Sequence, residues 1–125
     1  MSADRELLEM AAKAAGMEHM RWSGPMGLCR MLDPTRPDTT GSIGAFWNPL
    51  TDDGDALRLA TKLHLYVKHF PFLEDDTDKY PGFLEVCRVD DSDPLFVDYL
   101  TNESGRLDAT RRAIVRAAAE IGRLQ

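Results

Sequence analysis

Apolar side chains recur at the three- and four-residue spacing of an amphipathic helix in three segments of the chain. These segments cover residues 4–15, about 53–64, and 109–122. In each segment, aliphatic or small residues share one face and charged residues occupy the opposite one. The pattern therefore predicts three helices that each bury one face. Helix caps are predicted at Asp52 or Asp53 and at Asp108, and a helix end at Gly16.

The segment 109–122 has the clearest division between an apolar and a polar face. Arg112, Arg116 and Glu120 follow one another at a spacing of four residues on the polar face, which allows weak ion pairing along the helix. The apolar face is rich in alanine, and small side chains let a helix approach its neighbours closely. The residues predicted to be buried on this face are Ala113, Ile114, Ala117, Ala118 and Ile121.

Three further segments are rich in β-branched and aromatic residues and predict strands. They cover residues 65–72, 83–89 and 95–100, and apolar and polar residues alternate in the last two. Acidic turns at residues 74–78 and 90–93 separate the segments. Short consecutive strands joined by such turns predict an antiparallel meander.

The stretch between the first two predicted helices is less regular. Residues 26–32 predict a strand, and residues 33–44 predict a loop because they are rich in proline, glycine and hydroxyl side chains. Residues 45–47 predict a short extended segment that ends at Asn48 and Pro49. The element order is thus α–β–β–α–β–β–β–α. It predicts an α+β fold in which about four or five mostly antiparallel strands are covered by three helices.

Length and composition fit a single globular domain spanning residues 1–125. With 43% hydrophobic and 29% charged residues, the chain has enough apolar material for a core and too little charge for disorder. No apolar run approaches the roughly 20 residues that cross a bilayer. The acidic N-terminus is unlike a secretory signal, so we expect a cytoplasmic protein. In that compartment Cys29 and Cys87 are predicted to be buried, reduced thiols.

Charge is distributed unevenly along the chain. Residues 1–105 contain 10 basic and 19 acidic residues, whereas residues 106–125 contain 5 arginines and 2 acidic residues. The acidic part disfavours long nucleic acids, which need a basic footprint. The basic end still suits one small anion. Two interpretations of its arginines remain open: a solvated face that balances the acidic residues, or a phosphate site built on paired guanidinium donors.

Aromatic residues supply the other half of such a site. Trp47 precedes the second predicted helix, where it either anchors the core or walls a pocket by stacking on a planar ligand. Tyr99, in the predicted strand at 95–100, is a further stacking candidate. The residues predicted to bind the ligand are Arg111, Arg112, Arg116, Trp47 and Tyr99.

No residue pattern indicates an enzyme, a cofactor or a metal site. The acidic residues 52–55 are interpreted as a helix cap, because the later glutamate of an EF-hand is missing. His64 and His69 are five residues apart, unlike zinc ligands on one helix face, and the two cysteines form no CxxC pair. The motifs of serine nucleophiles, phosphate-binding loops and HExxH zinc sites are missing from the sequence. We expect a non-enzymatic protein without a cofactor or a metal.

Three stretches together resemble small accessory proteins of tailed bacteriophages and prophages, and in layout the phage ABA-sandwich family. They are RELLEMAAKAAG at 5–16, WNPLTDDGDALRLATKL at 47–63 and ATRRAIVRAAAEIG at 109–122, or 43 of the 125 residues. Residues 17–46 and 64–104 carry no resemblance. The family layout implies an α/β/α-type sandwich, in which helices cover a sheet. It implies no catalytic residues.

The resemblance implies a counter-defence role in the cytoplasm of a bacterial host. On this interpretation the protein binds or sequesters a small nucleotide-derived immune signal, such as a cyclic nucleotide or a cyclic ADP-ribose-type molecule. The binding site would be formed by the arginine and aromatic residues named above, and a homo-oligomer, most simply a dimer, is expected. The alternative is an inhibitor that binds a host defence protein through the acidic turns. Neither interpretation involves long nucleic acids or a membrane.

Overall fold

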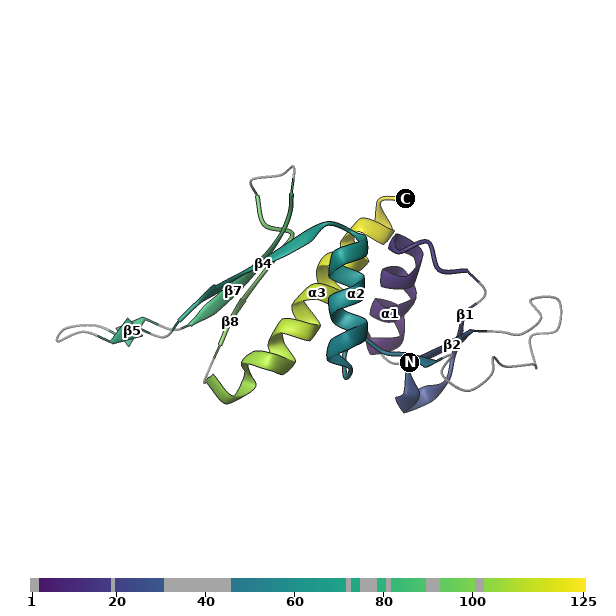
Figure 1. Cartoon of the computed structure of the whole chain (residues 1–125), viewed down its shortest axis with the longest axis horizontal. Helices are drawn as coiled ribbons and strands as arrows, with labels where there is room; N and C mark the ends of the chain where they lie inside the picture. Colours follow the sequence, from purple (N-terminus) through teal and green to yellow (C-terminus); the bar gives the residue numbers. More distant parts are fainter. Residues whose placement is uncertain are drawn as a thin grey trace.

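Three helices form the middle layer of the structure, with a three-stranded antiparallel sheet on either side (Figure 1). The computed structural model describes residues 3–18, 20–30, 46–71, 73–74, 79–80, 82–89, 93–100 and 103–125. The helices are α1 (Ala3–Ala14), α2 (Asp53–Lys62) and α3 (Arg106–Arg123). None of these described helices combines the length and the apolar composition that crossing a membrane requires.

The strands form two three-stranded sheets and a small hairpin, all antiparallel. The first sheet, in the order β1–β2–β3, consists of Met20–Trp22, Leu28–Arg30 and Phe46–Trp47. The second, in the order β4–β7–β8, consists of Leu65–Phe70, Phe83–Arg88 and Phe96–Tyr99. The hairpin pairs β5 (Leu73–Glu74) with β6 (Lys79–Tyr80). Short 3₁₀ turns cover Gly24–Met26 and Glu103–Gly105.

Helices α1 and α3 run parallel to each other in close contact. Arg112 Nη1 lies 3.2 Å from Asp4 Oδ1 near one end of the pair, and Lys13 Nζ lies 3.1 Å from the carbonyl oxygen of Gln125 at the other. Between them, the α-carbon of Gly122 approaches the backbone of α1 so closely that a side-chain β-carbon there would overlap the carbonyl oxygen of Met10. The two helices can therefore meet backbone to backbone only because residue 122 is glycine.

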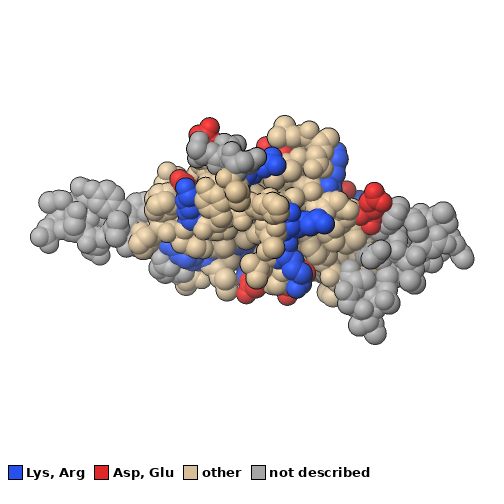
Figure 2. Space-filling model, turned by 45° about the horizontal axis from the view of Figure 1, so that its top comes forward, with Lys and Arg blue, Asp and Glu red and all other residues tan. Residues whose placement is uncertain are grey.

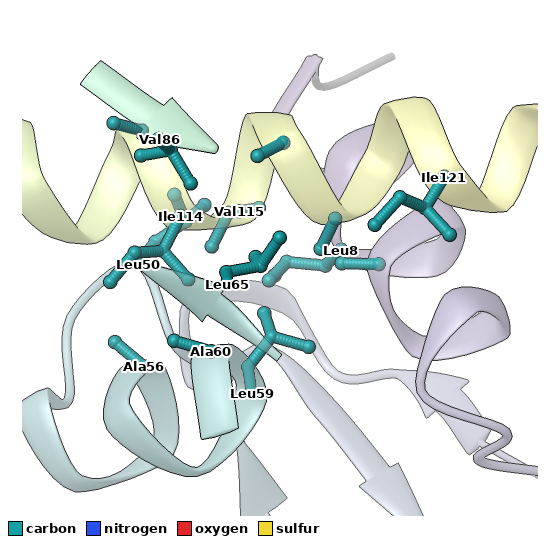
Figure 3. Close-up of a cluster of buried hydrophobic side chains, with 14 of the residues drawn as sticks. Leu8, Leu50, Ala56, Leu59, Ala60, Leu65, Val86, Ile114, Val115 and Ile121 are labelled. Atoms are coloured by element: carbon teal, nitrogen blue, oxygen red, sulfur yellow. The ribbon is translucent and has the colours of Figure 1, made fainter. Parts of the chain in front are cut away.

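The core lies where the three helices meet the β4–β7–β8 sheet. Figure 3 shows side chains from α1, α2, α3 and the sheet pointing into one cluster, among them Leu8, Leu59, Val86 and Ile114. Leu84 and Val86 are fully buried on the sheet face that meets α3. The predicted apolar face of α3 is confirmed, because all five of its residues are buried: Ala113, Ile114, Ala117, Ala118 and Ile121.

The predicted α+β class, the three helices and the antiparallel β4–β7–β8 meander are confirmed. The two sheets hold six strands, slightly more than the four or five expected. The cap at Asp52 is also confirmed, since its Oδ2 accepts a hydrogen bond from the backbone N–H of Asp55 at 2.8 Å. Strand β1 was not predicted. The predicted loop at 33–44 and most of both acidic turns lie outside the described residues.

Two details differ from expectation. The helices lie between two sheets, whereas the family layout places helices outside one sheet. The predicted cap at Asp108 is wrong, because α3 begins at Arg106 and its N-cap is Gly105. Arg106 is drawn into the helix by tertiary contacts: its Nη2 donates to the carbonyl oxygen of Phe70 at 2.8 Å, and its Nη1 lies 3.2 Å from His69 Nδ1. Asp108 instead faces Arg111 from the first turn.

We predict that Gly122→Ala lowers the free energy of unfolding by about 1–3 kcal/mol, the usual cost of forcing extra volume into a packed contact. The methyl group must push α1 and α3 apart, because it meets backbone and not a flexible side chain. Gly54→Ala in α2 is the matched control, since the atoms nearest to its methyl group are side-chain ends of Asp52 and Arg58, at 3.2–3.3 Å, and not backbone. Urea unfolding of both variants tests this. Equal stability of the two would contradict the close contact.

Candidate functional site

The five predicted ligand-binding residues do not converge on one place. Arg111 is a structural tie between α3 and the start of α2. Its Nη1 lies 2.6 Å from Asp53 Oδ1, and its Nε donates to the carbonyl oxygen of Leu50 at 3.0 Å. The side chain is 17% exposed, and its hydrogen bond with Asp53 raises the pKa of the guanidinium above its ordinary value. Arg111 is therefore committed to the fold.

Arg112 and Trp47 are also engaged within the protein. The half-exposed Arg112 pairs with Asp4 and joins α3 to the first turn of α1. Trp47 is only 8% exposed and belongs to the hydrophobic core. The interpretation of Trp47 as a core anchor is therefore the one that its burial supports.

Arg116 and Tyr99 lie on opposite faces of the β4–β7–β8 sheet. The guanidinium of Arg116 lies over the ring of Phe96, with Cζ 5.3 Å from the ring centroid, on the face that meets α3. Tyr99 follows Phe96 by three residues along β8, so its side chain points to the other face, where its ring lies 5.5 Å from that of Phe83. One small ligand cannot contact both residues.

Arg116 lines a hollow of about 330 Å³ between the C-terminal half of α3 and the start of β8, which we call the Arg116 hollow. Its apolar lining comes from Leu7, Pro94, Leu95, Phe96 and Leu124, and its charged lining from Arg116, Glu120 and Arg123. Arg123 pairs with Glu120. No carboxylate in the part of the chain that the structure describes pairs with Arg116.

The contact with Phe96 prepares Arg116 for an anion. A guanidinium that lies over an aromatic ring is held by its face, while the N–H groups at its edge stay available to donate hydrogen bonds to a carboxylate or phosphate. Because the contact with the ring favours this side-chain position before binding, less conformational entropy is lost when an anion binds. The sequence pointed to Arg116 but did not single out Phe96. The one available signal was that Phe96 belongs to the alternating strand predicted at residues 95–100.

A second hollow, of about 260 Å³, lies beside Trp47 and is lined by Ala15, Met17, Trp47, Arg58, Leu59 and Lys62. We call it the Trp47 hollow. Arg58 is engaged there, because its Nη2 lies 2.6 Å from Asp55 Oδ1. Lys62 has no ion-pair partner among the described residues. The Trp47 hollow is thus a competing anion site whose cation is a flexible lysine.

A third hollow, of about 340 Å³ at the end of α1, suits an anion least. It carries Glu9 and Glu18 against a single Lys13. The amine of Lys13 already donates to the carbonyl oxygen of Gln125.

Figure 2 shows a face of the molecule on which Lys and Arg side chains gather over the middle and acidic side chains lie toward the edges. Basic groups are therefore concentrated locally although the chain is acidic as a whole.

Within the described ranges, no group of three or more His, Cys, Asp or Glu residues is placed to hold a metal ion. Cys29 and Cys87 are both buried free thiols, as the sequence predicts. The acidic turns on which the alternative function depends give no described surface, because residues 75–78 and 90–92 lie outside the described residues.

No protein-family model matches the chain, and no curated protein or solved structure matches it.

We predict that Arg111→Met lowers the free energy of unfolding by about 1.5–3 kcal/mol, the range for hydrogen bonds to charged groups. The lower part of that range is expected because Asp53 is 63% exposed and partly screened by water. Arg5→Met is the control, because its ion pair with Glu9 is exposed on both sides, 49% and 47%. Surface pairs of this kind contribute about 0–1 kcal/mol. Chemical denaturation measures both, and a larger loss for Arg5→Met would refute the structural role of Arg111.

Proposed function

We propose that this chain is a non-enzymatic binding protein that holds a small nucleotide-derived anion in the Arg116 hollow. The observation that carries the proposal is the guanidinium of Arg116. It lies over Phe96, borders a hollow of about 330 Å³, and has no carboxylate partner among the described residues. Hollows of this size are at the lower end of those that hold small molecules.

The lining of the Arg116 hollow offers both charged groups and apolar surface to a ligand. Arg116 supplies paired donors for a phosphate. Arg123, which pairs with Glu120, adds positive charge at the rim of the hollow, although its guanidinium is less available than that of Arg116. Leu7, Leu95 and the accessible parts of Phe96 offer apolar contact to a base or a sugar face. Two arginines and one glutamate leave the hollow with one net positive charge.

The size of the ligand is limited by the charge of the rest of the chain. The net charge is −6, so an extended polyanion would be repelled wherever it left the hollow. A mono- or dinucleotide that ends within the hollow avoids this cost. The chemistry therefore favours small, compact nucleotides, such as the cyclic nucleotides or cyclic ADP-ribose-type molecules that the phage resemblance implies.

The biological role follows from this chemistry together with the phage resemblance. A protein that binds a nucleotide signal without converting it lowers the free concentration of that signal. We propose that the chain sequesters such a signal in the cytoplasm of a bacterial host and so counters a nucleotide-dependent defence. The residues assigned to the site are Arg116, Arg123 and Phe96; Arg111, Arg112, Trp47 and Tyr99 are not assigned to it.

We predict that a thermal-shift screen with cyclic mono- and dinucleotides and cyclic ADP-ribose isomers finds a stabilising ligand, and that Arg116→Ala weakens its binding about tenfold or more. A charge-assisted hydrogen bond contributes about 1.5–3 kcal/mol, and each 1.4 kcal/mol changes affinity tenfold. Isothermal titration calorimetry gives the affinities. Lys62→Ala, which removes one positive charge from the Trp47 hollow, is the matched control and should bind like the unmodified chain.

The two variants also distinguish the competing sites. If Lys62→Ala loses affinity while Arg116→Ala keeps it, the ligand occupies the Trp47 hollow and our assignment is wrong. If no compound in the screen raises the melting temperature, the chain does not bind this class of nucleotide.

A further inference from the structure

The two faces of the β4–β7–β8 sheet have different surroundings. In antiparallel strands, residues paired across the ladder point to the same face. Val67 pairs with Val86 and faces α3, whereas Lys68 pairs with Glu85 and faces away. The described helices that contact this sheet, α2 and α3, pack on the side of Val86 (Figure 3). We call the opposite side the outer sheet face.

Aromatic rings run across all three strands on the outer sheet face. Phe70 of β4 stacks on Phe83 of β7, with ring centroids 4.2 Å apart and an interplanar angle of 6°. Phe83 in turn contacts Tyr99 of β8 at 5.5 Å. Tyr99 is 68% exposed and Tyr66 is 38% exposed. Phe70 and Phe83 are half-buried, and Cys87, which pairs with Tyr66, is fully buried. The accessible aromatic surface is therefore concentrated toward Phe83 and Tyr99, and exposed apolar surface of this kind suits an interaction site.

The outer sheet face carries one positive and one negative charge from its three strands. Lys68 and Glu85 are neighbours in the register, yet no ion pair joins them within the described residues. The amine of Lys68 lies over the ring of Tyr66 instead, 5.3 Å from its centroid. The face is thus neutral overall and offers two charges that lack a carboxylate or amine partner in the described part of the chain.

Neutrality decides between the partners that an aromatic sheet face can take. Single-stranded nucleic acids stack on aromatic side chains, but they also need a basic groove along the backbone, and one lysine beside one glutamate does not form one. Two copies of this chain each carry a net charge of −6. Their mutual repulsion is weakest where the contacting surfaces are neutral, and the outer sheet face is such a surface.

The pattern of the face is also complementary to itself. A two-fold axis parallel to the strands and between β4 and β7 places Lys68 of each copy opposite the partner's Glu85. The same rotation places Phe70 opposite the partner's Phe83. Such reciprocal contacts are what a symmetric dimer requires.

We propose that the outer sheet face is the contact surface between two copies of this chain. The strands are four to six residues long, so the area is small compared with a standard protein interface. The dimer is therefore weak and concentration-dependent. This proposal does not depend on the nucleotide site, because that site lies on the other side of the sheet.

The test uses charge exchange between two variants. In a Lys68→Glu dimer, both symmetric contacts join two glutamates, and in a Glu85→Lys dimer they join two lysines. Sedimentation equilibrium should show each variant about tenfold or more weaker in self-association than the unmodified chain, because like charges across an interface are strongly unfavourable. Mixed in equal amounts, the variants should associate as well as the unmodified chain, since every contact then joins a glutamate and a lysine.

Matched controls carry the same charge changes on the helices. Lys62→Glu in α2 and Glu9→Lys in α1 are exposed and away from the outer sheet face, so both should associate like the unmodified chain. Thermal unfolding followed by circular dichroism checks that every variant folds. Three results would overturn the proposal. In the first, the unmodified chain stays monomeric at high micromolar concentration, with or without single-stranded RNA. In the second, the dimer survives both charge reversals. In the third, the two variants fold but their equal mixture fails to associate.

Discussion

The close contact between α1 and α3 is the constraint on which the rest of the structure depends. Because residue 122 has no side chain, α1 can lie against the backbone of α3. The alanines at 113, 117 and 118 are fully buried, so α3 is also enclosed by its other neighbours. One helix is thereby packed by α1, α2 and the β4–β7–β8 sheet at once. Little of its surface remains exposed, and the exposed strip carries Arg116, Glu120 and Arg123.

The arginines of α3 show how position along one helix separates structural from binding roles. Arg111 and Arg112 lie where α2 and the start of α1 bring carboxylates within reach. Arg116 lies one turn further on, beside β8, where its described neighbour is the ring of Phe96. The same residue type therefore ties elements together at two positions and stays available at the third. What differs is the element opposite each arginine.

The sequence predicted most of the fold, because a helix of ten or more residues or an alternating strand of about six leaves a periodic pattern of apolar residues. The three-residue strand β1 is too short to show such a period. The cap at Asp108 was wrong because local preference was outweighed by the contact of Arg106 with Phe70. The site was predicted only as a group of arginines. Which arginine stays available for a ligand depends on the carboxylates that pair with the others. Asp53 is 58 residues from its partner Arg111, and Asp4 is 108 residues from its partner Arg112.

The parallel pairing of α1 with α3 has a consequence for the order of folding. Asp4 and Arg112 are partners across 108 residues, so the first helix acquires its main packing surface only when the last one is present. Contacts this distant in sequence require a large loop to close before they stabilise anything, and they slow folding. During synthesis, the apolar face of α1 stays exposed until α3 has been made. The chain is therefore exposed to misassociation or to chaperones until residues 106–123 have emerged.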